Sequence, residues 1–203
     1  MISLYIGGAR SGKSGLAEQE VSDIALPTTY IATATSSVSM AERIALHREQ
    51  RPDDWVTEEI PLELASALTQ IDRKQSVIII DCLTLWLTNQ LMAKHCLIDE
   101  IERLCDTFTS MQCHLVLVST EVGQGLIPDD EMSQQFVTAS GLMHQKIAAI
   151  ADRVSFCQSK LAIRLKEPER TISDTTASDT NASETSASET TAIEGAVTAG
   201  GNT

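Results

Sequence analysis

The chain has 203 residues, of which 42% are hydrophobic, so it is long enough for one domain with a substantial core and slightly too short for two. Its formal net charge of −13 argues against a nucleic-acid partner, because nucleic-acid surfaces need Lys and Arg to neutralise phosphates. No stretch is long and apolar enough to span a membrane, no signal peptide is recognisable, and the five cysteines have no disulfide or metal-site spacing. We therefore expect a reduced, cytoplasmic protein.

The N-terminal segment carries the strongest local signal. Residues 2–6 are apolar and predict a strand, and Lys13–Ile24 predicts a helix. Between them, GGARSGKS matches the phosphate-binding pattern G-x-x-x-x-G-K-[ST], in which backbone N–H groups and a helix N-terminus surround a phosphate. A Gly- and Ser-rich turn that only happens to contain a lysine is the alternative, but the strand before it and the helix after it favour binding of a nucleoside triphosphate. The predicted contacts are Gly7, Gly8, Ala9, Arg10, Ser11, Gly12, Lys13 and Ser14, with Lys13 on the terminal phosphates and Ser14 on Mg²⁺.

Strands and helices alternate along the following residues. Further strands are predicted over Thr28–Thr33, Val77–Asp81, Leu115–Thr120, Arg153–Gln158 and Leu161–Leu165. Further helices are predicted over Met40–Gln50, Leu62–Ile71, Leu83–Lys94, Asp99–Met111 and Asp130–Ile150. This alternation predicts an α/β fold of the P-loop NTPase type, a doubly wound and mostly parallel sheet with helices on both faces. Ligands of such sheets bind beyond the carboxyl ends of the strands.

Two places in this order carry candidate chemistry. Asp81 ends an apolar strand, where a carboxylate can orient Mg²⁺ or its bound water, although a helix N-cap would also use Asp. Arg43 and His47 lie four residues apart on a predicted helix, with Arg48 and Arg51 close by. A neutral imidazole among arginines can attack phosphorus. From the residues alone, however, a surface or phosphate-binding histidine is favoured over a nucleophile.

Five segments, in this order, resemble one known family. They are GGARSGKS at 7–14, YIATA at 30–34, RIxxHRxxRPxxWxTxE at 43–59, IIIDCLTLWLTNQL at 78–91 and VLVSTEVGQGLIP at 116–128. Together they resemble the bifunctional adenosylcobinamide kinase / adenosylcobinamide-phosphate guanylyltransferase family of cobalamin biosynthesis, over about residues 1–166. The P-loop alone occurs in many families, whereas the His-Arg-x-x-Arg-Pro-x-x-Trp pattern at 47–55 and the Glu-Val-Gly-x-Gly pattern at 121–125 are far more restricted.

The resemblance implies a reaction scheme and a set of site residues. His47 matches the guanylylated histidine, which takes GMP from GTP and passes it to adenosylcobinamide phosphate to give adenosylcobinamide-GDP. The kinase step phosphorylates a hydroxyl of adenosylcobinamide with GTP or ATP. Implied nucleotide contacts beyond the loop are Ala32, Thr33, Ala34, Arg48, Glu49, Gln50, Arg51, Glu59 and Asp81. Catalysis would involve His47 and Lys13, Mg²⁺ would lie on Ser14 and Asp81, and the resemblance also implies a homo-oligomer.

The chain departs from the family pattern at two places. His144 stands where the family commonly has Asn, and Ser159-Lys160 stands where the last strand pair often has a glycine turn. Glu121 begins the loop after a predicted strand, where a supporting role and a plain turn role are both open.

Two other functions fit parts of the sequence. One is a P-loop small-molecule kinase without nucleotidyl transfer, in which His47 only binds phosphate. The other is a GTP switch or regulatory ATPase, but a switch needs an Asn-Lys-x-Asp element, which the sequence lacks.

Residues 167–203 differ from the rest in composition. The repeats TASDT, NASET and SASET cover 176–190, and the segment holds seven acidic residues and one basic residue. With little to bury, it is predicted to be a disordered acidic tail beside a catalytic domain at 1–166.

Overall fold

The computed structural model describes residues 1–34, 52–125 and 129–168. Its strands are β1 (Ile2–Gly7), β2 (Thr28–Ala32), β3 (Val56–Glu59), β4 (Val77–Asp81), β5 (His114–Thr120), β6 (Arg153–Gln158) and β7 (Leu161–Lys166). Its helices are α1 (Lys13–Ile24), α3 (Leu64–Ile71), α4 (Leu83–Met92), α5 (Leu97–Ser110) and α6 (Glu131–Ile150).

The described strands form one sheet in the order β3-β2-β4-β5-β1-β6-β7. All neighbouring pairs are parallel except β6 and β7, which form an antiparallel pair at one edge. The carboxyl ends of β1 to β6 therefore meet along one side of the sheet. This is the side where a doubly wound sheet binds its ligands.

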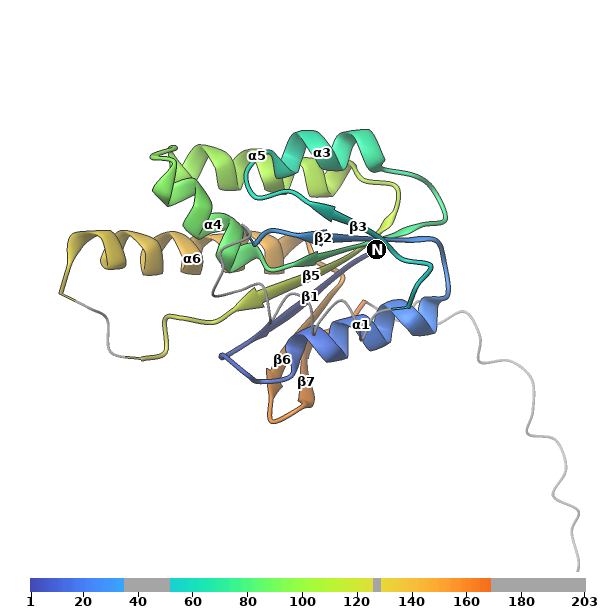
Figure 1. Cartoon of the computed structure of the whole chain (residues 1–203). Coiled ribbons are helices and arrows are strands. Elements are labelled where there is room, and N and C mark those ends of the chain that lie inside the picture. Colours follow the sequence, from blue (N-terminus) through green and yellow to red (C-terminus); the bar gives the residue numbers. More distant parts are fainter. Residues whose placement is uncertain (35–51, 126–128, 169–203) are drawn as a thin grey trace, which may run out of the picture. The chain divides into compact units, whose positions relative to one another are not determined.

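Helices cover both faces of the sheet within the described residues. Figure 1 shows α3, α4 and α5 on the face opposite α1. Strand β4 shows why both faces need cover, because Ile78 and Ile80 pack into the core under α3 to α6 while Val77 and Ile79 pack under α1. All four are at most 1% exposed, as a central strand between two helical layers requires.

The α/β class predicted from the sequence is confirmed, and most element boundaries agree within a few residues. Strand β3 was not predicted, because it has only four residues, lies at the sheet edge and leaves Val56 57% exposed. The predicted helix over Met40–Gln50 and the tail at 169–203 lie outside the described residues, so the division into 1–166 and 167–203 stays a prediction. Within the described part of the chain, no helix is both long and apolar enough to span a bilayer.

Candidate active site

The loop between β1 and α1 folds back on itself, so that two of its later residues donate hydrogen bonds to Gly8 O. Ser11 N donates to Gly8 O at 3.3 Å, and Lys13, only 8% exposed, donates from Nζ to the same carbonyl at 3.3 Å. The lysine ammonium therefore lies across the loop. Ser11 Oγ is buried and has no hydrogen-bond partner among the described atoms. A cation and a spare hydroxyl at a helix N-terminus suit an anionic ligand.

Two glycines of this loop are required by the close approach of β6 and of the turn that follows it. A Cβ on Gly7 would lie 2.4 Å from Cys157 O, and one on Gly12 would lie 2.9 Å from the Cα of Lys160. Gly12 also has φ +91°, a left-handed conformation that favours glycine. A Cβ on Gly8, by contrast, would meet no described atom within 4 Å. The loop is thus packed on one side, and Gly8 has space beside it.

Three predicted site residues lie level with one another across the sheet. Ala32 on β2 pairs with Asp81 on β4 and with Glu59 on β3. Asp81 pairs in turn with Val118, which pairs with Tyr5 on β1. We call these five positions the edge row. Neighbouring strands lie about 4.8 Å apart. Asp81, two strands from β1, is therefore about 10 Å from β1 along the row, and Glu59, four strands away, is about 19 Å from it.

Asp81 occupies the place predicted for it, at the end of a buried strand and two strands from the loop. Tyr30 donates from its hydroxyl to Asp81 Oδ2 at 2.8 Å, which orients the carboxylate. Ser14, in the first turn of α1, is half-buried. A carboxylate and a hydroxyl are oxygen ligands of the kind that Mg²⁺ prefers, so these two residues fit the ion.

The segment Ala32–Ala34 is fixed by contacts to β4 and α4. Thr33 donates from Oγ1 to Cys82 O at 2.7 Å and accepts from Cys82 N at 3.0 Å. Its carbonyl accepts from Asn89 Nδ2 at 2.8 Å. The side chain of Thr33 is fully buried, so its hydroxyl holds the segment in place beside Asp81. Glu59 is exposed at the end of β3.

Several of these contacts were missed by sequence reasoning. Tyr30 lies 51 residues from Asp81, and Asn89 lies 56 residues from Thr33, so no local spacing connects them. His47, Arg48, Glu49, Gln50 and Arg51 lie outside the described residues.

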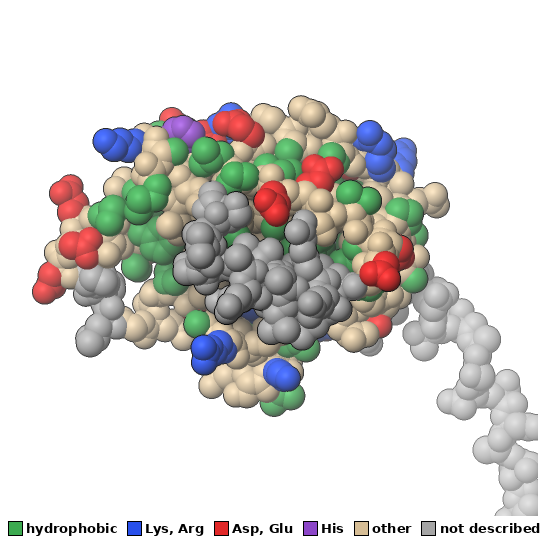
Figure 2. All heavy atoms as spheres, viewed as in Figure 1, with side chains coloured by type: hydrophobic (Ala, Val, Ile, Leu, Met, Phe, Trp, Pro, Cys, Tyr) green, Lys and Arg blue, Asp and Glu red, His purple; other side chains and the backbone are tan. Residues whose placement is uncertain are grey.

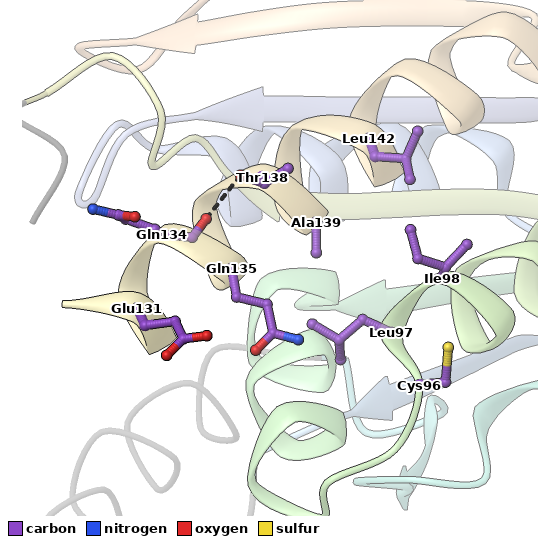
Figure 3. A pocket seen from close by; sticks show the side chains of 9 residues that line it. All are labelled: Cys96, Leu97, Ile98, Glu131, Gln134, Gln135, Thr138, Ala139 and Leu142. Carbon is purple, nitrogen blue, oxygen red and sulfur yellow. Dashed lines mark hydrogen bonds between the residues drawn. The ribbon is translucent and has the colours of Figure 1, made fainter. Parts of the chain in front are cut away.

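A separate hollow of about 450 Å³ lies between the start of α5 and α6. In Figure 3, Leu97, Ile98 and Leu142 extend into the space between these helices. Figure 2 shows hydrophobic side chains gathered at this end of the molecule. None of the residues that line the hollow belongs to the loop at 7–14 or to the edge row.

The packed loop, the buried lysine and the carboxylate at the end of β4 define a P-loop nucleotide-binding α/β protein. Solved structures agree at the level of the fold. A Pyrococcus horikoshii protein (Project ID PH0250) has a TM-score of 0.51 at 8% identity, covering 82% of this chain and 86% of that one. A type III secretion ATPase of pathogenic bacteria has a TM-score of 0.50 at 8% identity, covering 76% of this chain and half of that one.

The chain belongs to the cobinamide kinase / cobinamide phosphate guanyltransferase family, whose sequence model matches residues 3–165. It is 41% identical to the bifunctional adenosylcobalamin biosynthesis protein CobP of Pseudomonas aeruginosa, covering 82% of this chain and 98% of the relative. The protein CobU of Salmonella typhimurium is 32% identical, with 82% of this chain and 100% of the relative covered. CobU of Escherichia coli is 30% identical over the same shares. The predicted family is confirmed, and the chain is an enzyme of cobalamin biosynthesis.

Proposed function

We propose that this chain performs both reactions of its family at the carboxyl edge of the sheet. In one, a hydroxyl of adenosylcobinamide attacks the γ-phosphorus of GTP or ATP, the nucleoside diphosphate leaves, and adenosylcobinamide phosphate forms. In the other, GMP passes from GTP to that phosphate, giving adenosylcobinamide-GDP. The observation that carries the proposal is the buried Lys13 across a P-loop, in a chain that matches this family over residues 3–165.

The guanylyl transfer is proposed to proceed through His47. Its imidazole nitrogen attacks the α-phosphorus of GTP, a P–N bond forms, and the bond to the β-phosphate oxygen breaks, so that pyrophosphate leaves. A phosphate oxygen of adenosylcobinamide phosphate then attacks the same phosphorus, and the P–N bond breaks to free His47. Lys13 stabilises the negative charge of the leaving pyrophosphate. Mg²⁺, held by Ser14 and Asp81 when bound, would neutralise further charge on the phosphates.

The edge row supports an orientation for the nucleotide. Glu59 lies at the far end of this row, about 19 Å from the level of β1 by strand spacing. An extended nucleoside triphosphate has about this length. We propose that the phosphates lie at the loop, near Ala9 and Arg10, and that the Glu59 carboxylate accepts hydrogen bonds from guanine N1–H and the 2-amino group.

The assembly state and location belong to the same proposal. Edge strand β7 leaves Leu161, Ile163 and Leu165 at 70%, 58% and 64% exposure, a row of apolar side chains that supports a homo-oligomer. Five cysteines without disulfide or metal-site spacing support a cytoplasmic location.

Labelling with α-³²P GTP and Mg²⁺, followed by denaturing electrophoresis, tests the histidine intermediate. We expect an acid-labile, base-stable label on the wild type and none on His47→Ala. The exposed His95 offers a matched control, and His95→Ala should label like the wild type. Lys13→Met should label poorly, because the leaving pyrophosphate loses its cation. A folded, GTP-binding wild type that takes no label would leave a small-molecule kinase as the function.

A further inference from the structure

A network of hydrogen bonds connects His144 on α6 to the carboxyl end of β5, and beside it lies Glu121, whose role the sequence left open. His144 is only 7% exposed. Its Nε2 lies 2.7 Å from Ser119 Oγ, and its Nδ1 lies 3.4 Å from Glu121 Oε2. Ser119 Oγ lies 3.0 Å from Thr84 Oγ1, which accepts from Thr120 N at 2.7 Å. The Glu121 carboxylate lies at the more exposed end of this network.

Glu121 lies beside the start of the phosphate-binding loop. Its backbone N donates to Gly7 O at 3.0 Å, and its strand lies between β1 and β4. Glu121 therefore directly follows a strand that lies between the two strands ending at Gly7 and at Asp81, and its carboxylate faces His144 on α6. Its Oε1 accepts from Gly123 N at 2.6 Å, while the side chain keeps 22% of its surface exposed. It is held by the backbone of its own loop and is not fully buried.

The carboxylate beside Nδ1 decides which nitrogen of His144 carries the proton. Burial lowers the pKa of His144, against the opposing effect of Glu121, so the ring is neutral at pH 7. A lone pair on Nδ1 would face the Glu121 carboxylate oxygen at 3.4 Å, so the proton lies on Nδ1 and points toward that oxygen. Nε2 then accepts from the Ser119 hydroxyl, and the single hydroxyl proton of Thr84 has two acceptors in reach, Ser119 Oγ at 3.0 Å and Thr120 O at 3.1 Å. Each hydroxyl proton has an acceptor in this arrangement.

We propose that Glu121 is the base of the kinase step and that His144 is the positioning residue that orients it. The proposal rests on the kinase activity proposed above. The oxygen of the acceptor hydroxyl forms a bond to the γ-phosphorus, and the bond from that phosphorus to the β,γ-bridging oxygen breaks. The nucleoside diphosphate leaves with the electron pair, and the hydroxyl proton moves to the Glu121 carboxylate. Guanylyl transfer through His47 has no hydroxyl to deprotonate, so it does not need this base.

Two amide substitutions at His144 separate positioning from packing. The Nδ2 of an asparagine stands close to the place of imidazole Nδ1, so His144→Asn can still donate to Glu121. The longer His144→Gln places its amide near the site of Nε2 and serves Ser119 instead. We expect kcat for adenosylcobinamide phosphorylation to fall about 100-fold in Glu121→Gln and about 10-fold in His144→Gln, but under about 3-fold in His144→Asn. KM for GTP should change less than about 2-fold, because no phosphate contact is lost.

Three readouts decide the matter. The rate of α-³²P GTP labelling should match the wild type in these variants, which shows that they fold and bind GTP. Glu102→Gln, on the exposed side of α5, should keep full phosphorylation. ¹⁵N NMR of the wild-type imidazole should show the Nδ1–H tautomer. Phosphorylation by Glu121→Gln at the wild-type rate, equal kcat values for the Asn and Gln variants, or an Nε2–H tautomer would overturn the proposal. A wild type that labels but never phosphorylates adenosylcobinamide would instead refute the kinase function itself.

Discussion

At the scale of single residues, Gly7 shows how packing rather than ligand contact can require a glycine. Its Cβ position lies 2.4 Å from Cys157 O and 2.7 Å from Ser11 Oγ, distances that force the backbone to move. Gly15, in the first turns of α1, has no described atom within 4 Å of its Cβ position. Packing therefore requires glycine at position 7 but not at position 15, although both residues lie in or beside the same loop.

Alanine substitutions at these glycines should have opposite effects. Gly7→Ala should lower the free energy of unfolding by about 1–3 kcal/mol through overpacking, and weaken GTP binding because the loop shifts. Gly15→Ala should raise stability by up to about 1 kcal/mol through helix propensity. Urea unfolding and calorimetric GTP titration measure both. A Gly7→Ala protein with wild-type stability would show that β6 can move to accommodate the added methyl group without a loss of stability.

At the scale of elements, the β6–β7 hairpin contacts the phosphate-binding loop from the edge of the sheet beyond β1. Gln158 pairs with Leu161, so Ser159 and Lys160 form a two-residue turn with φ of 53° and 62°. Such turns favour Asn-Gly, because both positions are left-handed. Lys160 N also donates to Ser11 O at 2.8 Å. The turn makes this hydrogen bond to the phosphate-binding loop although Ser159 and Lys160 are unfavourable in a left-handed conformation.

The turn is therefore expected to gain stability from its preferred residues. Ser159→Asn with Lys160→Gly should raise the free energy of unfolding by about 1 kcal/mol, because left-handed strain is removed at both positions. Arg164→Gly, in the neighbouring strand β7, should instead lower it by up to about 1 kcal/mol. Thermal unfolding of the three proteins tests this. Equal melting temperatures for the wild type and the double variant would count against strain in the turn.

At the scale of the whole molecule, Glu20 on α1 connects the helix to three strands. Its carboxylate accepts from Ser3 at 2.7 Å, from Arg153 at 3.1 Å and from the Tyr5 hydroxyl, and His114 Nε2 lies 3.6 Å away. Burial acts to raise the pKa of Glu20, but His114, Tyr5, Ser3 and Arg153 outweigh it and lower the pKa to about 2.

This cluster predicts part of the acid sensitivity of the fold. A carboxylate whose pKa falls on folding stabilises the folded state above its unfolded value of 4.5, and that stability is lost as the pH falls toward about 2. Glu20→Gln should cost about 3 kcal/mol at pH 7, and the difference from the wild type should shrink below pH 4. Urea titrations at pH 7 and pH 3 measure it. Glu102→Gln should differ from the wild type by under about 0.5 kcal/mol at either pH, and a constant penalty for Glu20→Gln would exclude the linkage.

Also at this scale, the sequence allowed the phosphate-binding loop, most strands and helices, the α/β class and the family to be predicted. These features depend on residues close together in the chain, such as the apolar run before GGARSGKS or the four buried residues of β4. The short edge strand β3 was missed, because four mostly polar residues carry too weak a pattern.

By itself, then, the sequence determined the local elements, the P-loop and the family. The tertiary structure decided the strand order, the edge row and the partners of the buried polar groups. Glu20 meets Arg153 across 133 residues, Tyr30 meets Asp81 across 51, and His144 meets Ser119 across 25. Contacts at such separations leave no period in the sequence, because they depend on which strands lie side by side after the whole sheet has formed.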